Sequence, residues 1–202
     1  MCSSDLASCP DLPPAGCRQA GRSRLVLRAG RRTDRVKYAW RHGAATSRTD
    51  LGDPIGGAND FALCIYDVPD GVATFDLDLH APSEASCPSG PRRCWSEAGR
   101  GLVYTDKTGS PGGLRSLLLR PGDSGEAGLR ARAAGELFLP ALPLHPPVTA
   151  AVVGSDGLCW SSVFASDDVR RNEGAAATGA FVARQQAHPE RACRSEPPAS
   201  TV

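Results

Sequence analysis

Eight cysteines in a chain of 202 residues constrain the fold more than any other feature of the sequence. They are Cys2, Cys9, Cys17, Cys64, Cys87, Cys94, Cys159 and Cys193. Zinc sites usually use cysteines separated by about two to four residues, but the closest pairs here, Cys9/Cys17 and Cys87/Cys94, are spaced more widely. Those gaps suit disulfides that close small loops, so the cysteines predict a disulfide-bonded protein from an oxidising compartment.

Short segments of alternating apolar and polar residues follow one another along the chain, and turns rich in Gly, Pro and Asp separate them. This pattern is typical of β-strands, and no segment shows a convincing helical period. The expected strands are 23–29, 35–42, 61–67, 72–80, 101–106, 113–120, 127–134, 148–154, 157–165 and 178–184. We therefore expect an all-β protein, an antiparallel β-sandwich of about 8–10 short strands stapled by disulfides.

The length suits a single domain, which we expect at residues 23–184. Residues 1–22 read as a Cys/Pro-rich leader, and residues 185–202 as a disordered C-terminal tail. No signal peptide is visible at the N-terminus, so either the protein is cytosolic or the recorded start lies downstream of the true one. We expect the second, because a cytosolic protein has little use for this cysteine pattern. No apolar run approaches the roughly 18 residues that span a bilayer.

The overall charge is close to zero. Lys and Arg number 23, Asp and Glu number 22, and the formal net charge is +1. A chain without a strong net field is not expected to attract nucleic acid or an anionic membrane. The expected partner is therefore an extracellular glycan or protein, with no nucleic acid, no membrane span and no cofactor.

Gly-Asp-Ser-Gly at 122–125 matches the letters around the nucleophile of trypsin-like serine proteases, and His42, Asp60 and Ser124 follow the chain order of that triad. The surroundings differ from that family, because Ser124 is followed by Gly-Glu rather than Gly-Gly-Pro, and only a short segment separates His42 from Asp60. Pro, Gly, Asp and Ser between two alternating segments are ordinary turn formers. We interpret Ser124 as a turn residue and expect no catalytic residues.

Two groups of residues are weak candidates for a metal site, with calcium the conceivable ion. Asp76, Asp78 and His80 share one face of an expected strand. A Gly-rich loop contains the other group, which consists of Asp50, Asp53, Asn59 and Asp60. The alternative interpretations are the solvated face of a strand and an ordinary polar loop, and these are favoured.

The large aromatic residues could form a stacking platform for sugars or fill the core. They are Trp40, Trp95 and Trp160, with Tyr38, Tyr66 and Tyr104. Trp95 and Trp160 each follow a cysteine, and Trp beside a disulfide is a common arrangement in a sandwich core. Core packing is therefore favoured over a binding platform.

Between about Cys9 and Arg184 the chain resembles an uncharacterised disulfide-containing all-β module of secreted proteins from environmental, myxobacteria-like bacteria. The resemblance rests on segments in this order: the Cys9/Cys17 leader with "LVLR", "KYAWRHGAAT", "FALCIYD", Cys87 with "CW", "LVYTDKTGSPGGL", "LLLRPGDSGEAGLRA", "LFLPALPL" and "GLCW". It implies a secreted all-β domain, and it implies no activity or ligand. Cys2 and Cys193 lie outside the shared pattern, and they could pair with each other, stay free or result from a wrong start.

Within that module we expect the pairs Cys9–Cys17 and Cys87–Cys94 as local loops and Cys64–Cys159 as a long-range bridge. The resulting hypothesis is a non-catalytic, secreted or cell-surface binding or structural module. One alternative is a secreted hydrolase that uses His42 or the face of Asp76 and Asp78. Another is a calcium-dependent adhesive module centred on residues 50–60.

Overall fold

The computed structural model describes residues 9–84, 93–107, 113–175 and 178–186, and its strands form two sheets. The five-stranded sheet has the order β1-β11-β10-β4-β5, with β1 at Arg18–Gln19, β11 at Cys159–Phe164, β10 at Val148–Gly154, β4 at Phe61–Asp67 and β5 at Thr74–Ala81. The eight-stranded sheet has the order β12-β13-β2-β3-β9-β8-β7-β6. Its strands are β12 (Val169–Ala175), β13 (Thr178–Gln186), β2 (Arg22–Ala29), β3 (Asp34–Gly43), β9 (Ala127–Gly135), β8 (Ser116–Arg120), β7 (Gly101–Thr105) and β6 (Trp95–Ala98).

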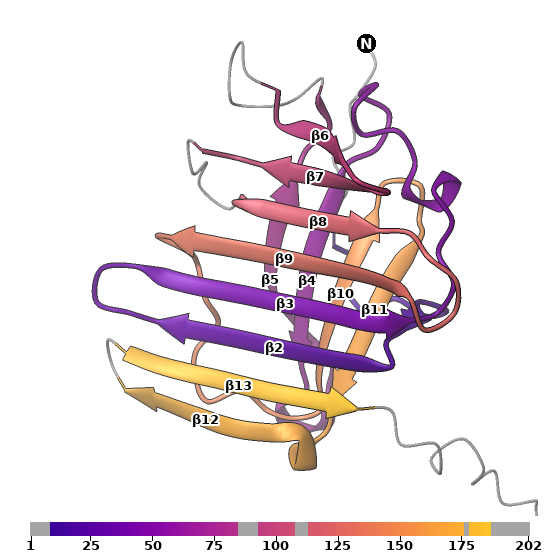
Figure 1. Ribbon diagram of the computed structural model, residues 1–202. Coiled ribbons are helices and arrows are strands. Elements are labelled where there is room, and N and C mark those ends of the chain that lie inside the picture. The colour runs from indigo at the N-terminus through magenta and orange to yellow at the C-terminus, as the bar shows by residue number, and fades with distance from the viewer. Residues whose placement is uncertain (1–8, 85–92, 108–112, 176–177, 187–202) are drawn as a thin grey trace, which may run out of the picture.

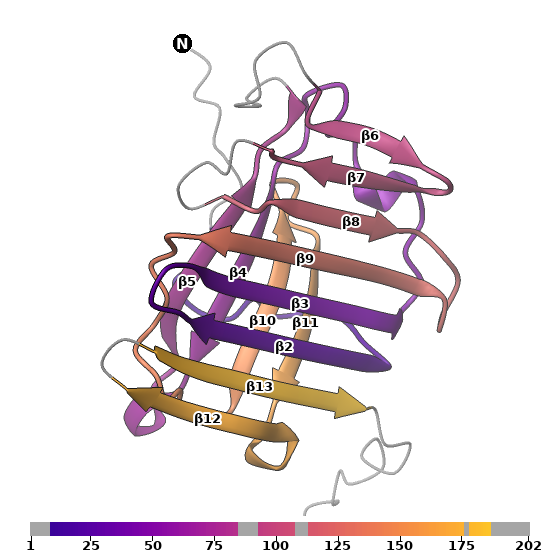
Figure 2. The ribbon, with the colours of Figure 1, turned by 60° about the vertical axis from the view of Figure 1, so that its left-hand side comes forward.

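The two sheets pack face to face, and the strands of one run across those of the other (Figures 1 and 2). Such crossed packing is one of the two usual ways in which sheets stack. Buried and exposed residues alternate along the strands of the eight-stranded sheet. One face therefore carries apolar side chains into the core, and the other faces solvent. Inward hydrogen bonds also join the sheets, since the Tyr38 hydroxyl donates to Ser162 Oγ at 2.9 Å and Trp40 Nε1 donates to the Ser161 carbonyl at 3.2 Å.

Part of the outer face of the five-stranded sheet is covered by the chain segment 9–19, whose last two residues form β1 at the edge of that sheet. Cys9 is bonded to Cys64 on β4, and Cys17 is bonded to Cys159 on β11. Between them the Tyr66 hydroxyl donates to the Pro10 carbonyl at 2.8 Å. This cover explains why every residue of β4 is buried, since one face of the strand meets the main core and the other lies beneath the segment.

Two expected disulfide pairings are wrong. Cys64 cannot reach Cys159, because β10 lies between their strands, with Ala151 opposite Cys64 and Val153 opposite Cys159. Two strand spacings of about 4.8 Å exceed the Cα separation that a disulfide tolerates. Cys9 and Cys17 are instead bonded to two different strands, Cys9 to Cys64 on β4 and Cys17 to Cys159 on β11. Cys94 is also disulfide-bonded, and its expected partner Cys87 lies outside the described residues.

The expected fold class is confirmed, because the described chain is a predominantly antiparallel, all-β sandwich with disulfides. All ten expected strands are present, and three further strands, β1, β6 and β12, were not expected. Residues 9–22, expected as a leader, belong to the sandwich through the two disulfides and through β1. Of residues 185–202, expected as a tail, Gln185 and Gln186 belong to β13, and residues 187–202 lie outside the described residues, as do Cys2 and Cys193. The part of the chain that the structure describes has no helix capable of crossing a membrane.

Candidate functional site

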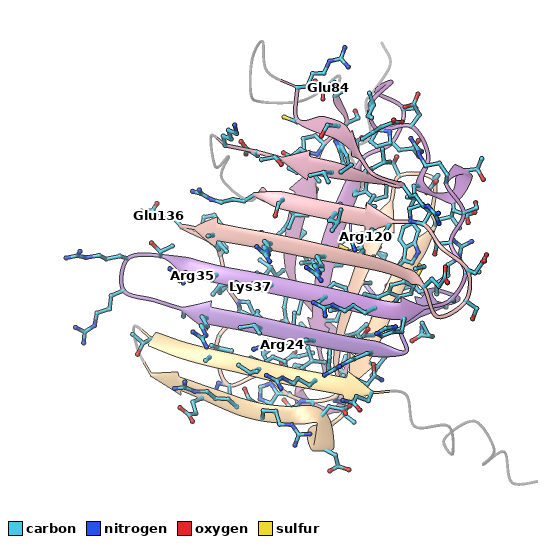
Figure 3. The ribbon with its side chains drawn as sticks, in the orientation of Figure 1. Arg24, Arg35, Lys37, Glu84, Arg120 and Glu136 are labelled. Atoms are coloured by element: carbon cyan, nitrogen blue, oxygen red, sulfur yellow. A yellow bond between two sulfur atoms is a disulfide. The ribbon has the colours of Figure 1, made fainter. Side chains whose placement is uncertain are left out.

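The solvent-facing side of the eight-stranded sheet carries an unusual concentration of positive charge, which we call the basic face (Figure 3). Five adjacent strands, β13, β2, β3, β9 and β8, alternate so that their apolar residues point inward and their basic residues point outward. The outward, exposed cations are Arg22, Arg24, Arg28, Arg35, Lys37, Arg41, Arg120, Arg130, Arg132 and Arg184. The basic face is thus defined by ten cations on five neighbouring strands.

The register of the strands places several of these cations directly opposite one another. The directly opposed pairs are Arg22 with Arg41, Arg28 with Arg35, Arg24 with Arg184, and Lys37 with Arg132. Residues in this relation have Cβ atoms about 5 Å apart, and like charges there destabilise a sheet. The arrangement therefore costs folding free energy.

Among the described residues, no carboxylate forms an ion pair with a cation of the basic face. Asp34, at the start of β3, is the only acidic residue in the five strands. Its carboxylate accepts hydrogen bonds from the backbone amides of Gly30 and Leu137 at 3.1 and 3.2 Å. The Arg–carboxylate ion pairs formed among the described residues are Arg18–Asp50, Arg48–Glu97 and Arg171–Glu173, and none of them includes a cation of the basic face.

The basic face is hollowed around Ala39, at the middle of the central strand. Arg24 and Arg130 lie directly opposite Ala39 on the strands at either side. Lys37 and Arg41 precede and follow Ala39 on the same face of β3, so four cations surround one small side chain. The effect on Arg130 is electrostatic: Arg41 foremost, then burial, Arg120 and Arg132, lower the pKa of its guanidinium.

Two further hollows continue this one across the sheet. One extends toward β13 and is lined in part by Arg22, Arg24, Ala39 and Arg184, with Asp167 and Asp168 also in its lining. The other extends toward β8 and is lined in part by Arg41, Arg120 and Arg130. Shared lining residues join the three into a track that crosses five strands, a distance of about 19 Å at 4.8 Å per strand spacing.

The large aromatic residues lie beneath this surface, where Tyr38 contributes to the lining of the central hollow and Trp40 to that of the hollow toward β8. All three Trp and all three Tyr side chains of the chain are buried in the cores, each at most 2 % exposed. Core packing, the favoured interpretation, is confirmed, and the described tryptophans and tyrosines form no exposed platform for sugars.

The acidic loop at residues 50–60 uses its polar groups to hold its own shape. Asp50 pairs with Arg18 at 2.9 Å, a hydrogen bond that, with one from the Ser47 amide, lowers the pKa of Asp50 to about 2. Asp53 Oδ1 accepts from the Gly56 amide, and Asn59 Oδ1 accepts from the Asp53 amide. The fourth candidate, Asp60, binds the backbone amide of Ser83.

The other candidate metal group is divided by a β-bulge. Asp78 and His80 are hydrogen-bonded to each other at 2.8 Å. Asp76 is the extra residue between the paired positions of β4 and β5, and it approaches Asp67 and His145 instead. Across the described chain, no cluster of three or more His, Cys, Asp or Glu residues has the arrangement of a metal site.

Asp67, Asp76 and His145 form a separate cluster. Asp67 Oδ2 accepts hydrogen bonds from the His145 backbone amide and lies 2.9 Å from His145 Nδ1. Burial, followed by the charge of Asp67 and a hydrogen bond with its carboxyl, raises the pKa of Asp76 to about 7. One oxygen of Asp76 is buried without a hydrogen-bond partner. The arrangement therefore favours a protonated Asp76.

The three residues with the order of a protease triad are held in separate interactions. Ser124 lies in the exposed turn between β8 and β9, closed by a hydrogen bond from the Glu126 amide to the Asp123 carbonyl at 2.9 Å. His42 Nδ1 is 3.2 Å from the Gly125 carbonyl, and Asp60 is bound to Ser83. The turn interpretation of Ser124 is confirmed.

The basic face was missed by the sequence analysis, although its signal is present in the strands. Arg or Lys recurs at alternate positions in the segments 22–28, 35–41 and 130–132. The net charge of the whole chain hides this pattern, because acidic residues elsewhere in the sequence cancel these cations in the sum. Comparison with family models, curated proteins and solved structures finds no match to this chain.

Proposed function

We propose that this chain is an extracellular, non-catalytic binding module that holds a polyanionic ligand on the basic face. The observation that carries the proposal is the set of four directly opposed like-charge pairs without carboxylate partners. A surface that opposes folding persists where a function depends on it, and an anionic ligand would neutralise the repulsion. The disulfides support an oxidising compartment, in agreement with the resemblance to secreted modules.

Arginine is also the cation best suited to this task. Nine of the ten cations are Arg, whose planar guanidinium donates paired hydrogen bonds to carboxylate, sulfate or phosphate groups. The hollows give an extended ligand a continuous path over these cations. The glycan or protein partner expected from the sequence is thereby narrowed to an acidic one.

The experiment is a titration of the oxidised protein into fluorescently labelled dextran sulfate, with binding followed by anisotropy and neutral dextran as the control polymer. We expect binding to dextran sulfate alone, and we expect it to weaken steeply as salt rises because exposed charges are screened. Replacement of Arg24, Arg41 and Arg130 by Gln should weaken binding by at least about three orders of magnitude, since each charged hydrogen bond contributes roughly 1.5–3 kcal/mol and about 1.4 kcal/mol is a tenfold change in affinity.

The matched control removes the same charge elsewhere. Arg48, Arg100 and Lys107 lie outside the five strands of the basic face, and their replacement by Gln should leave the affinity within about twofold because distant surface charges are screened. Equal loss of affinity in both triple variants, or equal binding of neutral dextran, would contradict the proposal.

A further inference from the structure

We infer that the hollow at Ala39 is a subsite for a single sulfate group and that the polyanion is a sulfated polysaccharide, an inference that rests on the proposed polyanion-binding function. Ala39 is the one outward position on β3 between Arg35 and Arg41 that lacks a charge. The flanking cations project past this short side chain on all four sides. The floor is therefore open to a small group, and the walls present positive charge.

The number of cations points to a group with several terminal oxygens. A carboxylate is planar, and one guanidinium can satisfy both of its oxygens. Four cations around one position, Arg24, Lys37, Arg41 and Arg130, provide donors from four directions. A sulfate ester presents three terminal oxygens in a tetrahedral arrangement, so it accepts hydrogen bonds from several of these donors at once.

Nucleic acid fits this surface less well. Proteins that bind single strands stack bases on exposed aromatic side chains, and the five strands of the basic face have no outward aromatic residue. Reading a duplex usually requires a helix or a β-ribbon that enters a groove, whereas this surface is a hollowed sheet. A phosphodiester also has only two terminal oxygens for the subsite.

The track defines how a polysaccharide would lie. Its hollows run from Arg184 on β13, past Ala39, to Arg120 on β8, and therefore cross the strands. Neutral sugar rings would lie over the small outward residues, and anionic substituents would meet the cations. The repeating sulfates of an extended chain would then occupy the subsite and its neighbours together.

The test fills the hollow without changing its charge. Ala39→Leu places a branched apolar group on the floor, and Ala134→Leu is the matched control, since Ala134 also points outward but lies outside the lining of the central hollow. Each variant is titrated with dextran sulfate, polygalacturonate and duplex DNA of equal charge per chain. We expect Ala39→Leu to weaken dextran sulfate binding about tenfold, since it blocks charged hydrogen bonds, and Ala134→Leu to leave it unchanged.

A second variant is needed in case the hollow accommodates the Leu side chain of Ala39→Leu without losing dextran sulfate binding. Ala39→Glu places a carboxylate among the four cations, so it should raise the melting temperature and abolish dextran sulfate binding. Unchanged dextran sulfate affinity in both Ala39 variants, or tighter binding of DNA or polygalacturonate than of dextran sulfate by the native protein, would overturn the sulfate subsite while leaving the polyanion function intact. Failure of all three polymers to bind the native protein would instead reject the proposed function.

Discussion

At the scale of single residues, Arg130 shows how repulsion between the cations of the basic face lowers the free energy of unfolding. Its guanidinium is surrounded by Arg41, Arg120 and Arg132, which lower its pKa along with burial. Replacing Arg130 by Gln keeps a polar, extended side chain but removes one source of repulsion. We expect the free energy of unfolding in urea to rise by about 0.5 kcal/mol, with the gain shrinking at high salt.

The control for this prediction is Arg100→Gln, at the turn between β6 and β7 and outside the basic face. That substitution should change stability by less than about 0.3 kcal/mol, because it lies away from the repulsive cluster. A native protein more stable than Arg130→Gln at low salt would show that the cations of the basic face do not repel one another appreciably.

A second residue-scale effect concerns pH. The pKa of Asp76 is raised to about 7 by burial and by Asp67, whereas an unfolded Asp titrates near pH 4. The folded protein therefore holds the proton more tightly than the unfolded chain. This stabilisation is complete below about pH 4 and is lost as pH rises toward 7, a decrease on the order of 2 kcal/mol because partial hydration moderates the effect.

Asp76→Asn supplies the neutral form at every pH and can still donate a hydrogen bond to the Asp67 carboxylate. We expect this variant to be more stable than the native protein above pH 7 and to lose the decline between pH 4 and 7, as measured by urea unfolding at several pH values. Asp78→Asn, two residues along β5 and hydrogen-bonded to His80, should retain the decline. An identical pH profile for Asp76→Asn and the native protein would exclude Asp76 as its source.

At the scale of elements, the segment 9–19 depends on its two disulfides. They link positions 55 and 142 residues apart and hold the segment over β4, β10 and β11. Replacing Cys17 and Cys159 together by Ser should lower the free energy of unfolding by roughly 2–5 kcal/mol. The variant should also bind a hydrophobic dye more strongly, since buried residues such as Ala62 and Val153 pack beneath the segment.

Peptide mapping without reduction tests the connectivity itself. We expect fragments that join Cys9 to Cys64 and Cys17 to Cys159. A fragment joining Cys9 to Cys17 would contradict the position of the segment over the sheet.

The sequence was informative about local structure and weak on long-range structure. Alternation along one strand is a local property, which is why the segments 23–29 and 127–134 were found. The strand β12 was missed because its Gly and charged residues show no apolar alternation, and it depends on pairing with β13. The disulfide pairing depends on which strands are neighbours, which cysteine spacing alone does not determine.

The candidate site was lost for a related reason. Each strand showed alternate Arg or Lys, but the basic face exists only because β13, β2, β3, β9 and β8 lie side by side. The strands β2 and β3 lie near the N-terminal end of the sandwich sequence, whereas β13, which pairs with β2, lies at its C-terminal end. The sequence does not give the order of the strands in the sheet, and only that order shows that their cations lie on one surface.

At the scale of the whole molecule, the net charge of +1 describes the protein poorly. The basic face carries ten of the 23 basic residues, while its five strands contain Asp34 alone of the 22 acidic residues. The rest of the sequence therefore contains more acidic than basic residues. A molecule with this separation of charge presents a local field that an anionic surface senses at short range, within a Debye length of about 8 Å at physiological salt.

Cation-exchange chromatography measures this property directly. At a pH near the sequence pI of about 7.6, we expect the native protein to bind a sulfonate resin despite its near-zero net charge, because the basic face docks on the resin. Replacement of Arg24, Arg41 and Arg130 by Gln should move elution to markedly lower salt. The variant with Arg48, Arg100 and Lys107 replaced has the same net charge, so coincident elution of the two triple variants would mean that total charge, not its arrangement, controls binding. Distinct elution would show that the fold concentrates on one sheet a charge that the composition conceals.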